Sequence, residues 1–260
     1  MPPKQQLKAL AENINSHPLY TKTCNPQTWQ YCSILCGPLW GLTFLLGLIA
    51  MRSFPPMPPS WDADRVHAHY KAYHTGTEAA AALFIFTGGF FLPWGAVISR
   101  QISRIPNVDP ILPQLQLASA AAGVFSFIFS GIFLGVITFR DRGPQLTLLL
   151  SDLFWISTLI QWPTLWMQSW TFAWAVFADC SARPMFPKLV AWVNVVTPIV
   201  FACATGVHTQ FHGPYAWNGV FAFWMALGFL GLEIGLDALS MLKNVREEGR
   251  VQEVVEVDSV

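Results

Sequence analysis

The sequence has 260 residues, of which 53% are hydrophobic and only 12% are charged, and its formal net charge at pH 7 is zero. A soluble globular protein carries about twice that share of charged side chains, so the composition indicates an integral membrane protein. Without net charge, the chain has no long-range field that would favour nucleic acid or another polyanion.

Residues 1–29 are polar and lack the short basic start of a cleaved signal peptide, so we expect a cytosolic or interfacial segment. The first apolar run covers residues 30–50. The cysteines of the chain form no CxxC or CxxH pair, which predicts free, buried thiols and neither a disulfide framework nor a zinc site. They are Cys24, Cys32, Cys36, Cys180 and Cys203.

A proline-rich loop of residues 51–75 comes next, and its second half is expected to form a short polar helix. Two acids and two histidines lie close together there, but His67 and His69 are two residues apart and lack the four-residue spacing of helical metal ligands. We expect a solvated loop. Apolar runs follow at residues 76–98 and 116–139, and in the latter Gly131 and Gly135 have the spacing that lets two helices approach closely.

Residues 145–179 form a fourth run with an unusual composition: an acid, Asp152, among apolar residues, and five tryptophans. At about 100° per residue round a helix, four of the tryptophans fall within about 80° of one another on the side of Asp152. They are Trp155, Trp162, Trp166 and Trp170. Pro163 should kink the helix halfway and open room for a ligand, so this face is interpreted as the wall of a cavity.

A fifth run covers residues 186–206 and a sixth covers 215–242, before a charged tail of residues 244–260 that we expect to be disordered. Six runs of about 20 residues predict an all-α polytopic bundle, with residues 30–243 as one transmembrane domain. Ten Lys and Arg side chains lie on the side of the termini and five on the other, which predicts cytosolic termini. No internal repeat is visible, so the inverted-repeat signature of secondary transporters is missing.

Three carboxylates are candidate catalytic residues. Asp152 should face the bundle interior, where it either stays protonated as a general acid or forms a structural ion pair with Arg140 or Arg142. Glu78 begins a helix, so capping alone explains it, although it is also a candidate site residue. Glu233 lies deeper in the sixth run, where a charge is expensive, whereas Asp237 is close enough to the end to reach the interface.

The candidate binding residues are less specific. The tryptophans are as consistent with core packing as with a binding role, even where they fall near the middle of the membrane. Asn194 and Asn218 are added as groups that would position a substrate oxygen, and His208 and Arg140 as further polar binding candidates. The full set of binding candidates is Trp155, Trp162, Trp166, Asn194, Asn218, His208 and Arg140. The chain contains no DDxxD, glycine-rich phosphate loop, HExxH or GxSxG motif, which disfavours diphosphate, nucleotide and common hydrolase chemistry.

Several segments together resemble a known family. They are FPPMPPSWDADRVHAHYKAYHTG, the PWG of the second run, FRDRGPQLTLLLSDLFW, ARPMFPKLVAWVN and GPYAWNGVFAFW. Over residues 6–242 the chain resembles the small fungal integral-membrane terpene cyclases of ascochlorin and ascofuranone biosynthesis. The resemblance implies a meroterpenoid cyclase of fungal secondary metabolism that closes rings on a farnesylated aromatic substrate with an epoxidised terminal alkene.

The physical chemistry of such a reaction fits the residues. Opening an epoxide needs a protonated acid, and Asp152 is the expected donor, with Glu78 or Glu233 as partner acid or terminal base. Aromatic faces stabilise the resulting carbocation by roughly 0.5 to 2 kcal/mol each. We therefore expect a cofactor-independent isomerase or lyase without a metal, multi-pass in the endoplasmic reticulum membrane. Its partners would be a lipophilic prenylated substrate, the bilayer and other enzymes of its pathway, and not nucleic acid.

Two alternatives use the same features without chemistry. A transporter or receptor for a lipophilic small molecule would use the same cavity, and discontinuous half-helices would favour it. A non-catalytic membrane scaffold would need Asp152 and Glu78 only for folding. The exact substrate and ring product depend on cavity shape and do not follow from the residues.

Overall fold

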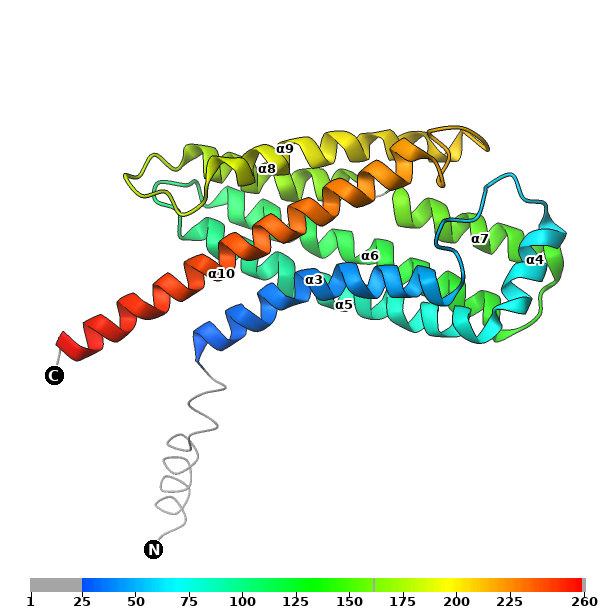
Figure 1. Cartoon of the computed structure of the whole chain (residues 1–260), viewed down its shortest axis with the longest axis horizontal. Helices are drawn as coiled ribbons and strands as arrows, with labels where there is room; N and C mark the ends of the chain where they lie inside the picture. The colour runs from blue at the N-terminus through cyan, green and yellow to red at the C-terminus, as the bar shows by residue number, and fades with distance from the viewer. Residues whose placement is uncertain (1–24, 161, 259–260) are drawn as a thin grey trace, which may run out of the picture.

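The computed structural model of the chain describes residues 25–160 and 162–258, with side chains for residues 25–160 and 163–250. The part described is helical and contains no strand, in agreement with the all-α prediction (Figure 1). The helices are α3 (Pro26–Ala50), α4 (Ala63–Ala72), α5 (His74–Ser103), α6 (Ile111–Phe139), α7 (Gly143–Leu159), α8 (Trp162–Ala178), α9 (Lys188–Phe201), η1 (Ala202–His208), η2 (Val220–Met225) and α10 (Ala226–Asp258).

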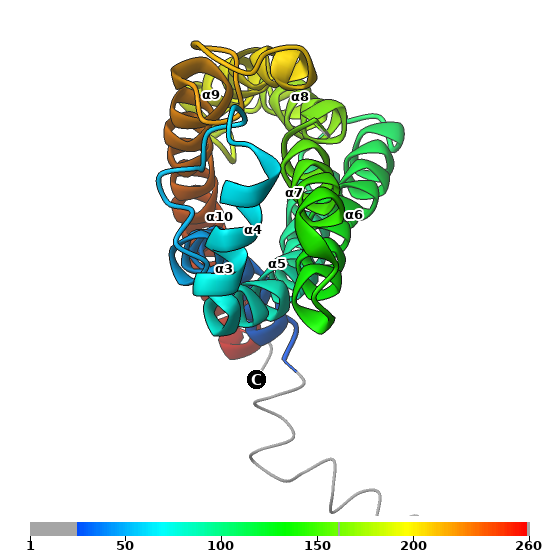
Figure 2. The ribbon, with the colours of Figure 1, turned by 90° about the vertical axis from the view of Figure 1, so that its right-hand side faces the viewer.

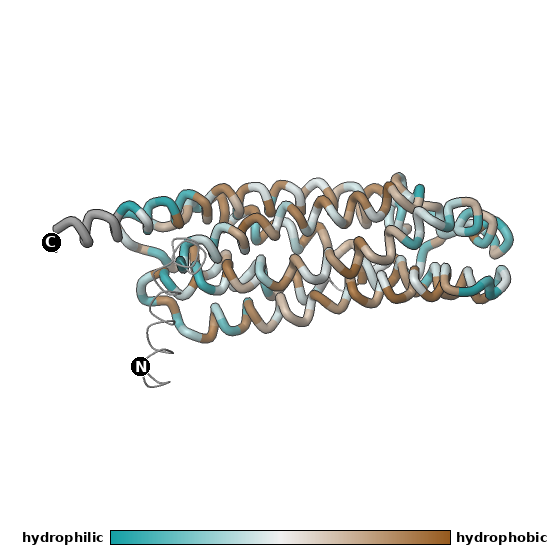
Figure 3. The backbone as a smooth tube through the Cα atoms, turned by 90° about the horizontal axis from the view of Figure 1, so that it is seen from below, coloured by the Kyte–Doolittle hydropathy of each residue, from teal (hydrophilic) through white to brown (hydrophobic). Residues whose placement is uncertain are grey.

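Six segments are long and apolar enough to cross a membrane, which confirms the predicted number. Apolar residues occupy the middle of the bundle and polar residues gather towards its two ends (Figure 3). Large apolar side chains are exposed along the outer faces, among them Leu46 and Ile49 on α3 and Phe125 and Phe129 on α6. In water such a surface would be costly, so these faces are suited to contact with lipid.

The helices pack in a closed ring, with neighbours in the order α3, α5, α6, α7 with α8, α9, α10 and again α3. The view along the bundle shows this arrangement (Figure 2). The start of α3 and the end of α10 lie at the same end of the bundle (Figure 1). A ring of this kind places the inner faces of all six segments around one centre.

Local sequence signals fix several helix ends. Asn25 accepts a hydrogen bond from the backbone N–H of Gln27 at 2.9 Å and precedes Pro26, which suits the first helical position of α3. Asp62 caps α4 in the same way through the N–H of Arg65, at 2.8 Å. The polar helix expected in the proline-rich loop is therefore confirmed as α4.

The fourth apolar run is divided near Pro163, as the sequence predicts. Helix α7 ends at Leu159, and α8 begins at Trp162. Pro163 has no N–H to donate to the carbonyl of Leu159, and a proline also disfavours helical geometry at the residue before it. A second irregularity is η2, a short π-helix of residues 220–225 that leads into α10.

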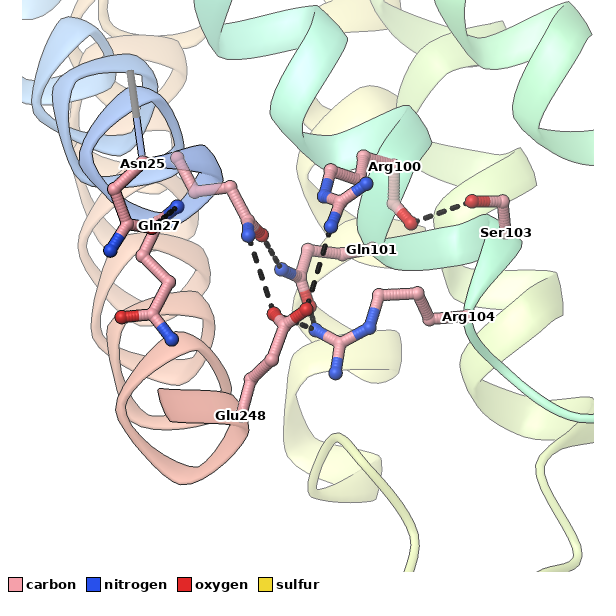
Figure 4. Close-up of polar contacts among 8 residues, drawn as sticks. Asn25, Gln27, Arg100, Gln101, Ser103, Arg104 and Glu248 are labelled. Atoms are coloured by element: carbon pink, nitrogen blue, oxygen red, sulfur yellow. Dashed lines mark hydrogen bonds and ion pairs between the residues drawn. The ribbon is translucent and has the colours of Figure 1, made fainter. Parts of the chain in front are cut away.

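The C-terminal segment differs from the expectation of disorder from residue 244 onwards, because α10 continues to Asp258. Within it, Glu248 receives a hydrogen bond from Gln30 on α3 at 3.3 Å and forms ion pairs with Arg100 and Arg104 beside α5, at 3.4 and 2.9 Å (Figure 4). These contacts join three helices at one end of the ring, which explains why the polar sequence stays helical here.

Two smaller expectations also need correction. Cys32, Cys36, Cys180 and Cys203 are free, as predicted, but Cys32 and Cys180 are exposed and the other two half-buried, while Cys24 lies outside the described residues. Of the two glycines in the third run, a Cβ at Gly131 would lie 2.8 Å from the Ala81 carbonyl oxygen, whereas a Cβ at Gly135 would meet nothing within 4 Å. Of these two glycines, Gly131 is therefore the one that permits close packing of α5 and α6.

Candidate functional site

An apolar cavity lies at the centre of the ring of helices, and its enclosed volume is about 80 Å³. We call it the aromatic cavity, because six aromatic side chains from α3, α5, α6, α9 and η2 line it. These are Trp40, Phe44, Phe91, Phe127, Phe201 and Phe223. The rings of Trp40, Phe91 and Phe127 form a cluster with centroids 5.0 to 5.8 Å apart. All six membrane-long segments contribute to its wall.

Both irregular backbone segments border this cavity. Thr158 and Leu159 line it from the end of α7, and Thr164 and Leu165 line it from the start of α8. Ala222 and Phe223 belong to the π-helix η2. Irregular backbone at membrane depth is tolerated where protein buries it or a cavity adjoins it, and π-helical turns are frequent at functional sites.

A second, more polar space adjoins the aromatic cavity, and four residues line both: Trp40, Phe91, Leu165 and Leu230. We call it the acid pocket, because Glu233 and Asp237 on α10 line it together with Gln168 and Ser169 on α8 and Asn194 on α9. Its enclosed volume is only about 10 Å³, which is about the room that one water molecule needs. The two spaces together place carboxyl groups beside a set of aromatic rings.

The two acids are buried and have different partners. Glu233 Oε1 accepts a hydrogen bond from Ser169 Oγ at 2.7 Å, and Asp237 Oδ1 accepts one from Asn194 Nδ2 at 2.9 Å. Glu233 is 6% exposed and Asp237 2%, so Asp237 does not reach the interface as the sequence suggested. No Lys or Arg is present among the described residues that line the pocket. Two adjacent buried carboxyl groups without a cation favour at least one shared or retained proton.

Three buried polar atoms around this pocket lack a hydrogen-bond partner among the described residues: Trp40 Nε1, Gln168 Oε1 and Glu233 Oε2. All three residues line the acid pocket, and their exposed fractions are 4, 4 and 6%. Buried polar atoms in proteins nearly always have partners, so an unpartnered set needs an explanation. A bound oxygen-containing ligand would accept from the indole N–H and from a neutral carboxyl, and its hydroxyl would donate to the Gln168 amide oxygen.

The other candidate acids lie elsewhere. Asp152 is half-buried and lines a separate surface pocket with Ser60, Trp61 and His212. It forms no ion pair within the described part of the chain, so the pairing with Arg140 or Arg142 is absent there. Glu78 is 52% exposed near the start of α5, with His74 at 3.6 Å.

The candidate binding residues are divided between the two regions. Asn194 belongs to the acid pocket. Trp155 is fully buried and stacks on Trp217 at 6.0 Å, and Trp166 packs against Trp170 at 4.6 Å, but neither lines the aromatic cavity. The side chain of Trp162 lies outside the described part. His208 and Arg140 are exposed and Asn218 is half-buried, all three outside both cavities.

Sequence reasoning missed most of the aromatic wall and the roles of Trp40, Gln168 and Ser169. These residue types are common in apolar helices, and only the packing of the helices into a closed ring brings them together. The polar pair of Gln168 and Ser169, one turn below Trp166 in a tryptophan-rich helix, was the available signal. No protein-family model, curated protein or solved structure matches this chain.

Proposed function

We propose that this protein is a membrane-bound terpene cyclase that protonates the terminal epoxide of a farnesylated aromatic substrate and cyclises its prenyl chain. The observation that carries the proposal is the position of Glu233 in the acid pocket, which adjoins the aromatic cavity: its Oε2 has no hydrogen bond within the described residues, although the Thr197 hydroxyl lies near the carboxyl group. The endoplasmic reticulum membrane and a role in fungal secondary metabolism are parts of the same proposal.

In this reaction Glu233, as the neutral acid, donates its proton to the epoxide oxygen. The bond from that oxygen to the more substituted carbon breaks, the oxygen becomes a hydroxyl, and the carbon becomes cationic. Electrons of the next alkene form the ring bond and move the cation along the chain. Loss of a proton from carbon to the Glu233 carboxylate ends the sequence and restores the acid, so the product is an isomer of the substrate and no cofactor is consumed.

The surroundings of Glu233 suit each step. Ser169 donates to one carboxyl oxygen, and at the other a substrate oxygen would compete with the nearby Thr197 hydroxyl. The Trp40 indole N–H is available to orient the epoxide oxygen. The ring cluster of Trp40, Phe91 and Phe127 offers faces to a passing carbocation, each worth roughly 0.5 to 2 kcal/mol. An apolar wall also keeps out the water that would capture the cation.

Asp152 fits this role less well than Glu233, although the sequence favours it. It lines an open surface pocket away from the aromatic cavity. A carbocation formed beside it would therefore not contact the aromatic rings of Trp40, Phe91 and Phe127. We therefore transfer the role of general acid to Glu233 and give Asp237, hydrogen-bonded to Asn194, the role of a neighbouring acid that limits ionisation of the pair.

The test uses the full chain in microsomes from a host without such pathways, supplied with a farnesyl-phenol terminal epoxide. We expect a cyclised isomer from the wild type, and a loss of about 10²-fold or more in rate for Glu233→Gln at matched protein level. The glutamine keeps an oxygen that accepts from Ser169, so folding should be preserved. Asp152→Asn is the matched control and should retain the rate within about threefold.

Two outcomes contradict the proposal. Loss of activity in Asp152→Asn with retention in Glu233→Gln would place the acid at the surface pocket instead. Saturable binding of the epoxide without any conversion by the wild type would favour a receptor or transporter for a lipophilic molecule, because the cavity would then hold a ligand without chemistry.

A further inference from the structure

A further pocket lies about two turns along α10 from Asp237 of the acid pocket, at the end of the bundle where α3 begins and α10 leaves the ring of helices. It is open to solvent, has a volume of about 690 Å³ and is lined from α10 and from the ends of neighbouring helices. We call it the basic pocket. Its lining consists of Arg104, Arg183, Pro184, Met185, Lys243, Asn244, Glu247 and Glu248.

Its charges do not cancel. Glu248 is already paired with both Arg100 and Arg104, and Glu247 lies 3.8 Å from Lys243. Arg183 forms no ion pair with any described residue. Three cationic side chains therefore line the pocket against two carboxylates, and Arg100, outside the lining, shares Glu248 with Arg104, which leaves an excess of positive charge that favours an anionic ligand.

The wall that carries Arg104 is held in place before any ligand binds. Glu248 accepts from Arg104 Nη1 at 2.9 Å, and Arg104 also donates to Gln101 Oε1 at 3.4 Å (Figure 4). Gln101 in turn donates to Gln30 on α3 at 3.0 Å. The guanidinium is thus fixed by neighbours on two helices, with part of its surface, 30% of the side chain, exposed.

The loop that carries Arg183 is also ordered by hydrogen bonds. Asp179 accepts from the hydroxyl and backbone N–H of Ser181 and from the N–H of Met185, at 2.9 Å for the last. Burial acts to raise the pKa of Asp179, but these hydrogen bonds outweigh it and the pKa lies below its usual value. Lys188 Nζ donates to the carbonyls of Val176 and Asp179 at 2.6 and 3.0 Å, which closes the loop against α8.

Asn244 supplies an independent indication of a ligand. It is 6% exposed, it lines the basic pocket, and its Nδ2 has no hydrogen-bond partner among the described residues. A buried amide N–H₂ without a partner costs about 1–3 kcal/mol, and an acceptor from outside the chain that bonds to it would recover this cost. The cations around it indicate that the acceptor carries negative charge.

We infer that the basic pocket binds a phosphate group, held by Arg104, Arg183 and Lys243 and by the amide of Asn244. Arginine and lysine side chains with an amide donor match the several acceptor oxygens of a phosphate. The pocket lies where the membrane-long helices end, which is the depth of lipid headgroups. An anionic phospholipid headgroup and free inorganic phosphate share this chemistry, and neither depends on the proposed cyclase activity.

The test measures thermal unfolding of the purified full chain in a non-ionic detergent during titration with dioctanoyl phosphatidate, dioctanoyl phosphatidylcholine or inorganic phosphate. We expect a saturable rise in Tm with phosphatidate, from which a Kd follows, and no rise with phosphatidylcholine. A rise with inorganic phosphate as well would assign the site to phosphate in general, whereas a rise with phosphatidate alone would assign it to lipid.

Two variants test the assigned donors. Arg183→Gln with Lys243→Gln should raise the Kd about tenfold or more, since each cation near a phosphate contributes about 1 kcal/mol. Asn244→Leu removes the unpartnered amide but keeps the branched shape and the number of side-chain heavy atoms, so it should fold yet bind several-fold more weakly. The control is Arg65→Gln with Lys71→Gln, two exposed cations on α4 at the opposite end.

Three results would overturn the inference. They are equal rises in Tm with phosphatidate and phosphatidylcholine, an unchanged Kd in Arg183→Gln with Lys243→Gln or in Asn244→Leu, and an equal loss of binding in the control on α4. The last would mean that net charge, and not this pocket, attracts the ligand.

Discussion

Trp40 carries a buried hydrogen-bond donor that a ligand of the proposed site could satisfy. Its indole N–H is buried without a partner among the described residues, and its ring faces both the aromatic cavity and the acid pocket. A donor in this position has a cost in the free protein that a substrate oxygen would recover. Trp155 has the same unpartnered N–H but lines neither the aromatic cavity nor the acid pocket, so it is a control for the loss of a buried indole.

We expect Trp40→Phe to lower kcat/KM for the farnesyl-phenol epoxide about fivefold to twentyfold, since one hydrogen bond to a polar ligand atom is lost. Trp155→Phe removes the same atoms from an equally buried indole and should lower stability to a similar degree while kcat/KM changes little. Steady-state kinetics at matched protein level, with Tm values for both variants, make the comparison. Equal losses of kcat/KM in the two variants would contradict a binding role for the Trp40 N–H.

A second residue-scale prediction concerns His69, which lies outside the membrane-spanning segments. Its Nε2 lies 3.0 Å from the Met51 carbonyl oxygen, and its ring packs between Trp61 and Tyr73. Burial lowers its pKa below the ordinary 6.5, against a smaller opposite effect of the Met51 carbonyl. The folded protein then binds fewer protons than the unfolded chain just below the ordinary value, so stability decreases as pH falls through that window and is fully present above it.

We therefore expect the Tm of the wild type to fall between about pH 7.5 and about pH 5.5 by more than that of His69→Gln. The glutamine amide still donates to a carbonyl but does not titrate, so the difference between the two proteins isolates His69 from the other histidines. Parallel pH profiles for the two proteins would show that His69 does not couple protonation to folding.

Asp152 illustrates what sequence could predict at the scale of one residue. An acid in an apolar run was rightly expected to be unusual, but its direction came from angles counted along one continuous helix. Helix α7 ends at Leu159 and α8 begins at Trp162, so a count along one helix does not relate Trp155 to Trp166. Even within α7 the prediction was wrong, because Trp155 is buried against Trp217 while Asp152 lines a surface pocket. Glu233 was among the candidates because of its depth, which is a property that hydropathy does report.

At the scale of elements, the sequence was more informative. Turn residues, caps and the length of apolar runs depend on local chemistry, so α4, the six spans and the break before Pro163 could all be predicted. Which faces of two helices meet depends on contacts between distant residues. Gly131 and Gly135 belong to the same four-residue spacing, yet an added Cβ would meet the neighbouring helix only at Gly131.

This difference gives a matched pair of substitutions on α6. A Cβ at residue 131 would lie 2.8 Å from the Ala81 carbonyl oxygen, so α5 and α6 would have to separate, and we expect Gly131→Ala to destabilise the protein by about 1–3 kcal/mol. Gly135→Ala meets open space and should be neutral or stabilise by up to about 1 kcal/mol through helix propensity. Unfolding in detergent measures both. A loss of stability in Gly135→Ala equal to that in Gly131→Ala would contradict the packing described for this pair.

At the scale of the molecule, the number of spans and the common end of the two termini followed from hydropathy, whereas the closure of the ring did not. Closure depends on contacts between the first and last spans, such as Gln30 with Glu248, which are 218 residues apart. The aromatic cavity exists because of that closure, since α3 and α10 both line it. A glutamate deep in an apolar run could therefore be recognised in the sequence. The residues on other helices that complete the acid pocket could not, because they meet it only in the folded bundle.

The distribution of Lys and Arg also predicts how the whole bundle is oriented in the membrane. The excess of Lys and Arg at the end with the termini predicts that this end, with the basic pocket, faces the cytosol.

Cys180 is exposed there, in the loop between α8 and α9, and Ser60 is exposed at the opposite end. In sealed microsomes, a membrane-impermeant maleimide should therefore label the wild type more than Cys180→Ser. Ser60→Cys, made in the Cys180→Ser background, should gain label only after permeabilisation. The reverse pattern would place both termini in the lumen, and the basic pocket would then meet the leaflet that is poorer in anionic lipid, where a headgroup ligand would be scarcer.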